Sequence, residues 1–176
     1  MSTLKANKCV GLLSLWILFG FWLMPASAEK GDIWLDINLG SIHEQNNYFW
    51  EGEVRSYNEF NPGLGITYEI NDLFDAKAGF FHNSYEELSS YVMIGFSPSV
   101  FSNSNSDWKV DVGGGIGLIT GYDDTPEQAE EISPWLMAIV GIEYKERYRF
   151  NIGYLPSSLF FETGVDVVMG QFSIKF

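Results

Sequence analysis

The sequence predicts an all-β protein, an eight-stranded antiparallel transmembrane β-barrel of the outer membrane. Three observations predict this fold. Segments of about ten residues alternate apolar and polar side chains with a period of two, as the strands of such barrels do. Short polar turns alternate with longer connections along most of the chain. An export leader precedes the strands, and no later stretch is long and apolar enough for a spanning helix.

The leader covers residues 1–28 and has the pattern of a cleavable signal peptide. Lys5 and Lys8 make its start positive, residues 10–24 form an apolar run of 15 residues, and Ala26-Ser27-Ala28 is a small-residue cleavage site. A spanning helix needs roughly 20 residues, so an uncleaved anchor is the weaker alternative. We therefore expect a mature domain over residues 29–176 that is located in the bacterial outer membrane.

Eight alternating segments are the predicted strands. They cover residues 33–42, 60–70, 73–82, 89–97, 108–120, 135–144, 147–156 and 165–176. In the seventh, Tyr148, Phe150 and Ile152 face one way, whereas Arg149 and Asn151 face the other. A soluble lipocalin-like or sandwich fold would need the apolar faces to point inward, while here the charges share a face.

The connections support the barrel. Tight polar turns are predicted at 71–72 and 145–146, and longer links at 44–59, 83–88, 121–134 and 157–164. The exception is the Ser- and Asn-rich link 98–107, which falls on the short-turn side. Long and short links are expected at the outer and periplasmic ends respectively. Small closed barrels are commonly monomeric, so a monomer is expected.

Charge and cysteine content exclude several functions. Loss of the leader leaves 8 basic and 23 acidic side chains, a net charge of about −15, which would repel nucleic acid. The single cysteine, Cys9, is lost with the leader, so the mature chain has no thiol nucleophile and no disulfide. The acidic residues are not at metal-ligand spacing, and no metal or cofactor is implied.

Inward-facing residues divide the predicted lumen into two halves when the N-terminus is taken as periplasmic. The lower half collects charges of both signs, which can pair and so offset the cost of burial. Its members are Asp36, Asn38, Thr67, Glu69, Asp75, Lys77, Lys109, Asp111, Glu143, Arg149, Asn151, Gln171, Ser173 and Lys175.

The upper half is rich in glycine and apolar residues. Glycines leave no side chain to fill the lumen, so they predict a cavity that suits a hydrocarbon chain. The alternative is that the glycines make room for Phe81, Tyr91 and Trp135 to pack. The residues predicted to line an acyl pocket are Gly63, Gly65, Gly79, Tyr91, Met93, Gly95, Gly115, Trp135 and Met137.

Two segments bring chemically active side chains to the same rim. One strand ends at His43, and another ends at His82-Asn83-Ser84. A histidine beside a serine hydroxyl is the minimum for nucleophilic or general-base acyl chemistry.

Five segments occur in an order and spacing that resemble the lipid A palmitoyltransferase family of outer-membrane enzymes. They are Gly40-Ser41-Ile42-His43, Tyr57-Asn58-Glu59 followed by Gly63-Leu64-Gly65, Phe81-His82-Asn83-Ser84-Tyr85, the glycine run 113–117, and Tyr154-Leu155-Pro156. The resemblance runs from about residue 33 to Phe176 with scattered identities. It implies transfer of a palmitoyl chain from an outer-membrane phospholipid to the lipid A of lipopolysaccharide.

The resemblance also implies roles for individual residues. His43 falls on the essential histidine of the family, Ser84 on its essential serine, and Gly95 on the glycine at the pocket floor. Pro156 lies near a proline that opens lateral access for lipid. Asn83 departs from the family, which carries aspartate there; we expect the amide to support the histidine and donate to an oxyanion. The N-terminal amphipathic helix of the family is also missing.

Two other functions are left open. His82 and Ser84 form an H-x-S pair that resembles lipid A deacylases, which are hydrolases. A non-catalytic barrel could instead bind a lipid or act in surface recognition through acidic loops that recruit divalent cations. Those loop residues are Glu44, Glu51, Glu53, Asp123, Asp124, Glu127, Glu130 and Glu131.

Overall fold

A computed structural model describes residues 31–102, 106–122, 131–157 and 165–176. The predicted signal peptide therefore lies outside the described residues. Eleven strands are present in the described part of the chain. They are β1 (Ile33–His43), β2 (Asn47–Trp50), β3 (Glu53–Ser56), β4 (Gly63–Glu69), β5 (Phe74–His82), β6 (Leu88–Phe96), β7 (Ser99–Ser102), β8 (Trp108–Thr120), β9 (Ile132–Tyr144), β10 (Tyr148–Leu155) and β11 (Val167–Lys175).

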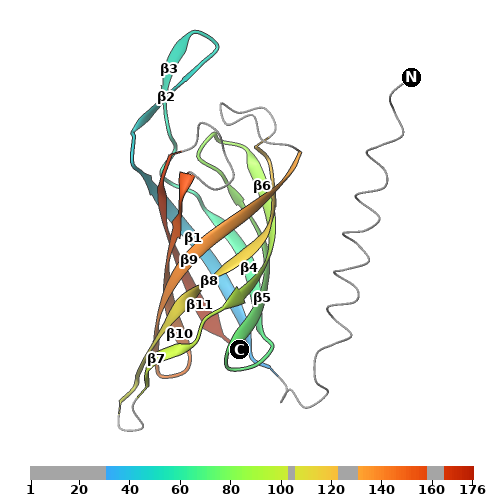
Figure 1. Ribbon diagram of the computed structural model, residues 1–176, viewed down its shortest axis with the longest axis vertical. Helices are drawn as coiled ribbons and strands as arrows, with labels where there is room; N and C mark the ends of the chain where they lie inside the picture. The colour runs from blue at the N-terminus through green and yellow to red at the C-terminus, as the bar shows by residue number, and fades with distance from the viewer. Residues whose placement is uncertain (1–30, 103–105, 123–130, 158–164) are drawn as a thin grey trace, which may run out of the picture. The chain divides into compact units, whose positions relative to one another are not determined.

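Eight of these strands form a closed antiparallel barrel, which confirms the predicted fold (Figure 1). Each strand of the ring pairs with its neighbour in sequence. The ring closes where β1 pairs with β11, from Trp34 opposite Lys175 to His43 opposite Val167. The predicted ranges agree with the observed strands to within three residues at each end, because a period-two pattern is clear wherever one face meets the lumen.

Three short strands were not predicted. β2 and β3 form a hairpin that rises from the long-loop end, turning through Glu51 and Gly52, which both have positive φ. β7 pairs with β8 at the short-turn end, on the same edge of β8 that β6 occupies (Figure 1). It lies within the link that was expected at 98–107. The Ser- and Asn-rich composition there is typical of loops, but pairing with β8 satisfies its backbone groups.

Tight turns close the other end as predicted. The side-chain oxygen of Asn71 accepts hydrogen bonds from the backbone N–H groups of Leu73 and Phe74, each at 2.9 Å. Lys145 and Glu146 both have positive φ, the geometry of a two-residue hairpin turn.

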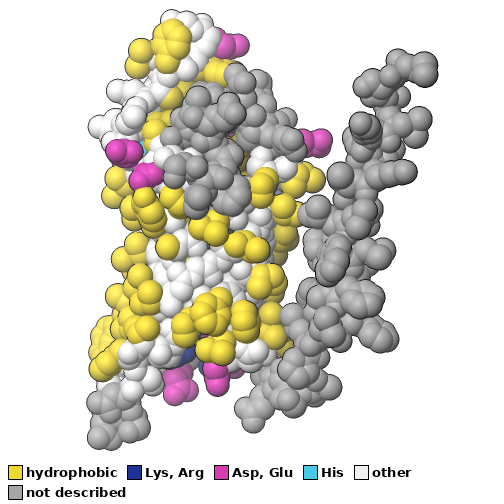
Figure 2. Space-filling view, viewed as in Figure 1, with side chains coloured by type: hydrophobic (Ala, Val, Ile, Leu, Met, Phe, Trp, Pro, Cys, Tyr) yellow, Lys and Arg dark blue, Asp and Glu magenta, His cyan; other side chains and the backbone are white. Residues whose placement is uncertain are grey.

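The outer wall of the barrel is apolar. Along β6 exposed and buried residues alternate without interruption, and the exposed ones include Val92, Ile94 and Phe96. Figure 2 shows hydrophobic side chains over the barrel wall and acidic side chains near its two ends. An exposed apolar surface around a closed barrel matches the hydrocarbon core of a bilayer. Within the described ranges, no helix has the length and hydropathy to cross a membrane.

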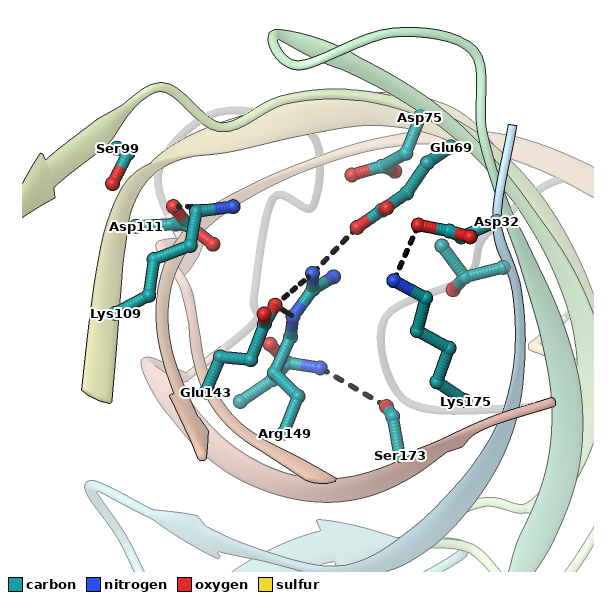
Figure 3. A network of polar contacts seen from close by, with 12 residues as sticks. Asp32, Glu69, Asp75, Ser99, Lys109, Asp111, Glu143, Arg149, Ser173 and Lys175 are labelled. Carbon is teal, nitrogen blue, oxygen red and sulfur yellow. Dashed lines mark hydrogen bonds and ion pairs between the residues drawn. The ribbon is translucent and has the colours of Figure 1, made fainter. Parts of the chain in front are cut away.

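A polar plug fills the half of the lumen nearest the short turns, as the sequence predicted (Figure 3). Arg149 lies at its centre, donates to Glu69 at 2.5 Å and to Glu143 at 2.6 Å, and packs over the ring of Trp34 at 4.1 Å. Since Glu69 is on β4 and Arg149 on β10, this ion pair crosses the lumen. The other ion pairs of the plug join Lys77 to Asp75, Lys109 to Asp111, and Lys175 to Asp32.

Hydrogen bonds from hydroxyl and amide side chains complete the plug. Asp36, which is fully buried, accepts hydrogen bonds from Thr67 at 2.5 Å and from Ser173 at 2.6 Å. Above it, Asn151 donates to Gln171 at 3.1 Å, and Gln171 donates to Asn38 at 2.9 Å. The plug is therefore a hydrogen-bonded floor beneath the apolar half of the lumen.

Replacing Gly113 by alanine is expected to destabilise the barrel by about 1–3 kcal/mol. A Cβ at this position would overlap the backbone oxygen of Phe96, and backbone of a paired strand cannot move aside cheaply. The matched control is Gly170→Ala, whose Cβ would meet only the ring of Phe150, at 3.6 Å. The stability of both variants is measured by urea unfolding of the refolded barrels. Equal unfolding midpoints for G113A and G170A would contradict the prediction.

Candidate functional site

A cavity of about 100 Å³ lies in the lumen between the plug and the long-loop end. Its wall is apolar and is formed by Phe81, Tyr91, Met93, Ile119, Trp135, Met137, Ile139, Leu155 and Met169. Its floor is the top of the plug, formed by the amide side chains of Asn38, Asn151 and Gln171 together with Lys77. Its mouth carries the polar side chains of Ser41, His43, Asn61 and Ser84.

The predicted pocket residues divide into two groups. Tyr91, Met93, Trp135 and Met137 line the cavity as predicted. The five predicted glycines do not line it, because atoms of neighbouring strands occupy the space that each glycine leaves. The backbone of Phe80 and Phe81 closes the space at Gly63, and the Leu64 carbonyl and the Tyr91 hydroxyl close it at Gly79. Side chains fill the other three spaces: Tyr91 at Gly65, Asp75 at Gly95 and Met93 at Gly115.

Close packing therefore explains most of the glycines. This was the alternative that the sequence analysis gave to a cavity for a hydrocarbon chain. The space that remains is modest, since an apolar cavity known to bind benzene has a volume of about 150 Å³. A palmitoyl chain does not fit the cavity as it stands. Three of the wall residues, Met93, Met137 and Met169, are flexible side chains that can adopt other rotamers.

The mouth of the cavity brings together residues from three parts of the chain. Ser41 and His43 project from the same face of β1, Ser84 follows β5, and Asn61 precedes β4. All four are buried, at 5–9% exposure. Ser41 donates to Asn61 at 2.5 Å, and the hydroxyl oxygens of Ser41 and Ser84 are 3.5 Å apart. The structure thus places His43 and Ser84 at the same cavity mouth, as the strand pattern predicted.

His43 is held by an aromatic neighbour. Its ring stacks on that of Tyr57, with centroids 4.2 Å apart and planes 3° from parallel. Tyr48 and Tyr85 pack around Tyr57, with centroids at 4.9 and 5.6 Å. The Nδ1 atom of His43 is buried and has no hydrogen-bond partner among the described residues. An oriented imidazole with a free nitrogen is suited to accept or donate a proton.

Asn83 does not serve the site in the way the sequence suggested. Its side-chain oxygen accepts from the backbone N–H groups of Tyr85 and Glu87, each at 2.9 Å, and its amide donates to Gly121 at 2.6 Å and to Ser89 at 3.1 Å. All four hydrogen bonds go to the turn after β5 and to its neighbours. Asn83 is fully buried and does not line the cavity, so its role is to hold the turn that carries Ser84.

Replacing Asn83 by aspartate is expected to destabilise the protein by about 1–3 kcal/mol. Aspartate would keep the two bonds from the backbone N–H groups, but a carboxylate cannot donate to the Gly121 carbonyl and would face that oxygen. The measurement is the unfolding midpoint in urea, with Asn58→Asp as a control at a half-buried position. Unchanged stability of N83D would show that the donor side of Asn83 is dispensable.

The H-x-S pair of the deacylase alternative is not formed. His82 is exposed on the outer face of β5, while Ser84 is buried at the cavity mouth. Successive strand residues point to opposite sides, and the turn begins at Asn83, so positions 82 and 84 do not share a face. The histidine that lines the cavity together with Ser84 is therefore His43, which comes from β1.

The ladder between β9 and β10 ends near Pro156, the residue predicted to open lateral access. In the described chain, the last pair is Ala138 with Tyr154, although β9 continues to Ile132. Asp166 ties the end of β10 to the start of β11, since it accepts from the Tyr154 hydroxyl at 2.5 Å and from the Ser157 amide at 2.9 Å. The hydrogen bond from Tyr154 lowers the pKa of Asp166.

The acidic loops were the basis of the surface-recognition alternative. Asp123, Asp124, Glu127 and Glu130 lie outside the described residues. Within the described ranges, no three His, Cys, Asp or Glu side chains gather in a way that could hold a metal ion.

Sequence reasoning missed Ser41, Tyr57 and Asn61 as members of the site. Ser41 could have been found, because it is two residues before His43 and therefore shares its strand face. Tyr57 and Asn61 lie in the segment before β4, and no strand periodicity predicts where such side chains point.

Comparison with known proteins supports the fold. No protein family model matches the chain, and no curated protein matches it. A de novo designed transmembrane β-barrel superposes with a TM-score of 0.57 at 15% identity, covering 84% of this chain and 98% of its own. A second designed barrel, TMB2.3, has a TM-score of 0.46 at 13% identity, with 84% and 98% covered.

The attachment invasion locus protein Ail of Yersinia pestis, solved with the heparin analogue sucrose octasulfate, has a TM-score of 0.36 at 15% identity, covering 84% of this chain and 100% of Ail. Taken with the closed ring and the apolar outer wall, the similarity to the first designed barrel shows that the chain has the fold of an eight-stranded transmembrane β-barrel.

Proposed function

We propose that this protein is an outer-membrane acyltransferase that moves a fatty acyl chain from a phospholipid to lipid A or a related lipid. One observation carries the proposal: a histidine with a free buried nitrogen and a serine hydroxyl lie at the mouth of an apolar cavity inside a membrane barrel. The cavity would receive the hydrocarbon chain while the ester stays at the polar mouth. The order of motifs that resembles lipid A palmitoyltransferases supports the same assignment.

The chemistry needs a base, a hydroxyl and a place for the chain. The Ser84 hydroxyl attacks the ester carbonyl of the phospholipid, and His43 takes its proton. The bond between the carbonyl carbon and the glycerol oxygen then breaks, and His43 returns the proton to that oxygen, releasing lysophospholipid. A hydroxyl of the acceptor lipid attacks the acyl-serine in turn, its proton passes through His43 to Ser84, and the acylated acceptor leaves.

Entry of a long chain requires movement of the cavity wall. Met137 and Met169 both pack against Gly153, where an added Cβ would lie 2.9 Å from Cγ of Met169. Methionine repacks readily because its unbranched side chain has several rotatable bonds. Each buried CH₂ group contributes about 0.8 kcal/mol, so a long chain can offset the cost of that repacking. Lipid would approach from the membrane through the seam near Pro156, where the β9–β10 ladder ends.

Acyl transfer is tested with the refolded barrel in vesicles of phospholipid carrying a radiolabelled palmitoyl chain, mixed with lipid A. We expect label to appear on lipid A together with an equal amount of lysophospholipid, and Ser84→Ala to abolish both. Label released as free fatty acid would make the protein a hydrolase. A wild type with no more transfer than S84A would overturn the proposal in favour of a non-catalytic lipid-binding barrel.

A further inference from the structure

Four residues at the cavity mouth form a closed circuit of hydrogen bonds. The side-chain amide of Asn61 donates to the backbone oxygen of Asn58 at 3.1 Å, and the backbone N–H of Asn58 donates to the backbone oxygen of Ser84 at 2.9 Å. Ser41 donates to the side-chain oxygen of Asn61 at 2.5 Å and lies 3.5 Å from the Ser84 hydroxyl. The circuit connects β1, the segment before β4 and the turn after β5.

Counting donors shows which way each hydrogen points. The amide nitrogen of Asn61 faces a carbonyl, which can only accept, so its oxygen must face Ser41. A hydroxyl has one hydrogen, and Ser41 gives it to Asn61. In the contact between the two serines, Ser41 can therefore only accept, and the hydrogen comes from Ser84.

We infer that Ser41 and Asn61 are positioning residues that hold the Ser84 hydroxyl ready for acyl transfer; the inference rests on the proposed function. With its hydrogen directed toward Ser41, Ser84 turns its lone pairs away from that contact. At 3.5 Å the contact is at the long limit of a hydrogen bond. The hydroxyl is therefore oriented but loosely held, and its hydrogen can leave Ser41 when the attack begins.

Three features support a positioning role over a merely structural one. Both side chains are 6% exposed and line the cavity, and position 41 did not have to be polar for β1 to form. The backbone N–H of Ser41 is already satisfied by Glu59 at 2.9 Å, so its hydroxyl is not needed to join β1 to the neighbouring segment. The Asn61 amide would not be fixed in its orientation without the Asn58 carbonyl.

The kinetic test compares Ser41→Ala, Ser41→Thr and the control Ser173→Ala. Ser173 is also a buried strand serine with one short hydrogen bond, but it lies in the plug. We expect S41A to lower kcat about tenfold with KM nearly unchanged, because orientation and not binding is lost. S41T retains the hydroxyl and should restore most of kcat, whereas S173A should leave kcat of the folded protein unchanged. Equal kcat in S41A and wild type would overturn the inference.

Two further readouts separate this inference from the proposed function. Acylation of Ser84 by p-nitrophenyl hexanoate, followed by mass spectrometry, measures the reactivity of the hydroxyl without phospholipid or lipid A. Crystal structures of wild type and S41A show whether Ser84 changes rotamer when its acceptor is removed, as we expect. If wild type transfers no acyl chain, the proposed function fails; an unchanged Ser84 rotamer in S41A overturns the inference in either case.

Discussion

Replacing His43 by alanine is expected to reduce acyl transfer by about 10²–10⁴-fold, the range for loss of a general base. Without the imidazole, the attacking hydroxyl loses the base that takes its proton in the proposed mechanism. The variant loses the stacking of the His43 ring on Tyr57, but the fold should survive, because the buried Nδ1 makes no hydrogen bond among the described residues that the barrel would lose. The measurement is the initial rate of transfer from labelled phospholipid to lipid A.

His82→Ala is the matched control for that result. The two histidines end β1 and β5 at the same rim, but His82 is exposed on the outer face, whereas His43 is buried at the cavity mouth. H82A should therefore transfer acyl chains at the wild-type rate. A larger loss in H82A than in H43A would reverse the assignment and restore the H-x-S site of a deacylase.

Replacing Arg149 by methionine is expected to destabilise the barrel by about 3–5 kcal/mol, the cost of removing one partner of a buried ion pair. Arg149 is 7% exposed, and its guanidinium group is the charge partner of both Glu69 and Glu143. Methionine leaves these carboxylates without a cation and removes the contact with the Trp34 ring. Urea unfolding in detergent micelles or vesicles gives the change in free energy.

Two variants make the result specific. Lys145→Ala removes an exposed cation that lies 3.9 Å from Asp107, and should change the stability by less than about 1 kcal/mol. Adding Glu69→Gln and Glu143→Gln to R149M should recover part of the loss, because the unpaired charges are then absent. If R149M is as stable as K145A, the ion pairs are not what holds the plug together.

The barrel could be predicted because its physics is local and repetitive. Each strand needs lipid-compatible residues on one face, so a segment such as β10 shows its register in the sequence itself. The plug followed from the same alternation, since charges on the inward face must find partners. The β2–β3 hairpin carries no such constraint: it is a separate two-stranded sheet above the barrel, and none of its strand residues is buried.

The site was harder to predict because it depends on side-chain contacts between distant segments. Alternation placed His43 and Ser84 at one rim and put His82 on the outer face beside the inward Phe81, but it could not show which way Ser84 points once β5 has ended. Counting glycines overestimated the cavity, because Tyr91 and Met93 reach into the space that those glycines leave. Asn83 falls where the resembling family carries aspartate, which suggested a role in the reaction. In the structure its four hydrogen bonds instead hold the turn after β5.

Photo-crosslinking with a phospholipid that carries a diazirine in its acyl chain tests most directly whether a fatty tail enters the lumen. The account predicts crosslinks to cavity-wall residues such as Met93, Trp135 and Met137, which are buried. These crosslinks should decrease when unlabelled phospholipid competes. Crosslinks confined to lipid-facing residues such as Ile116 and Val140, with none in the lumen, would contradict it.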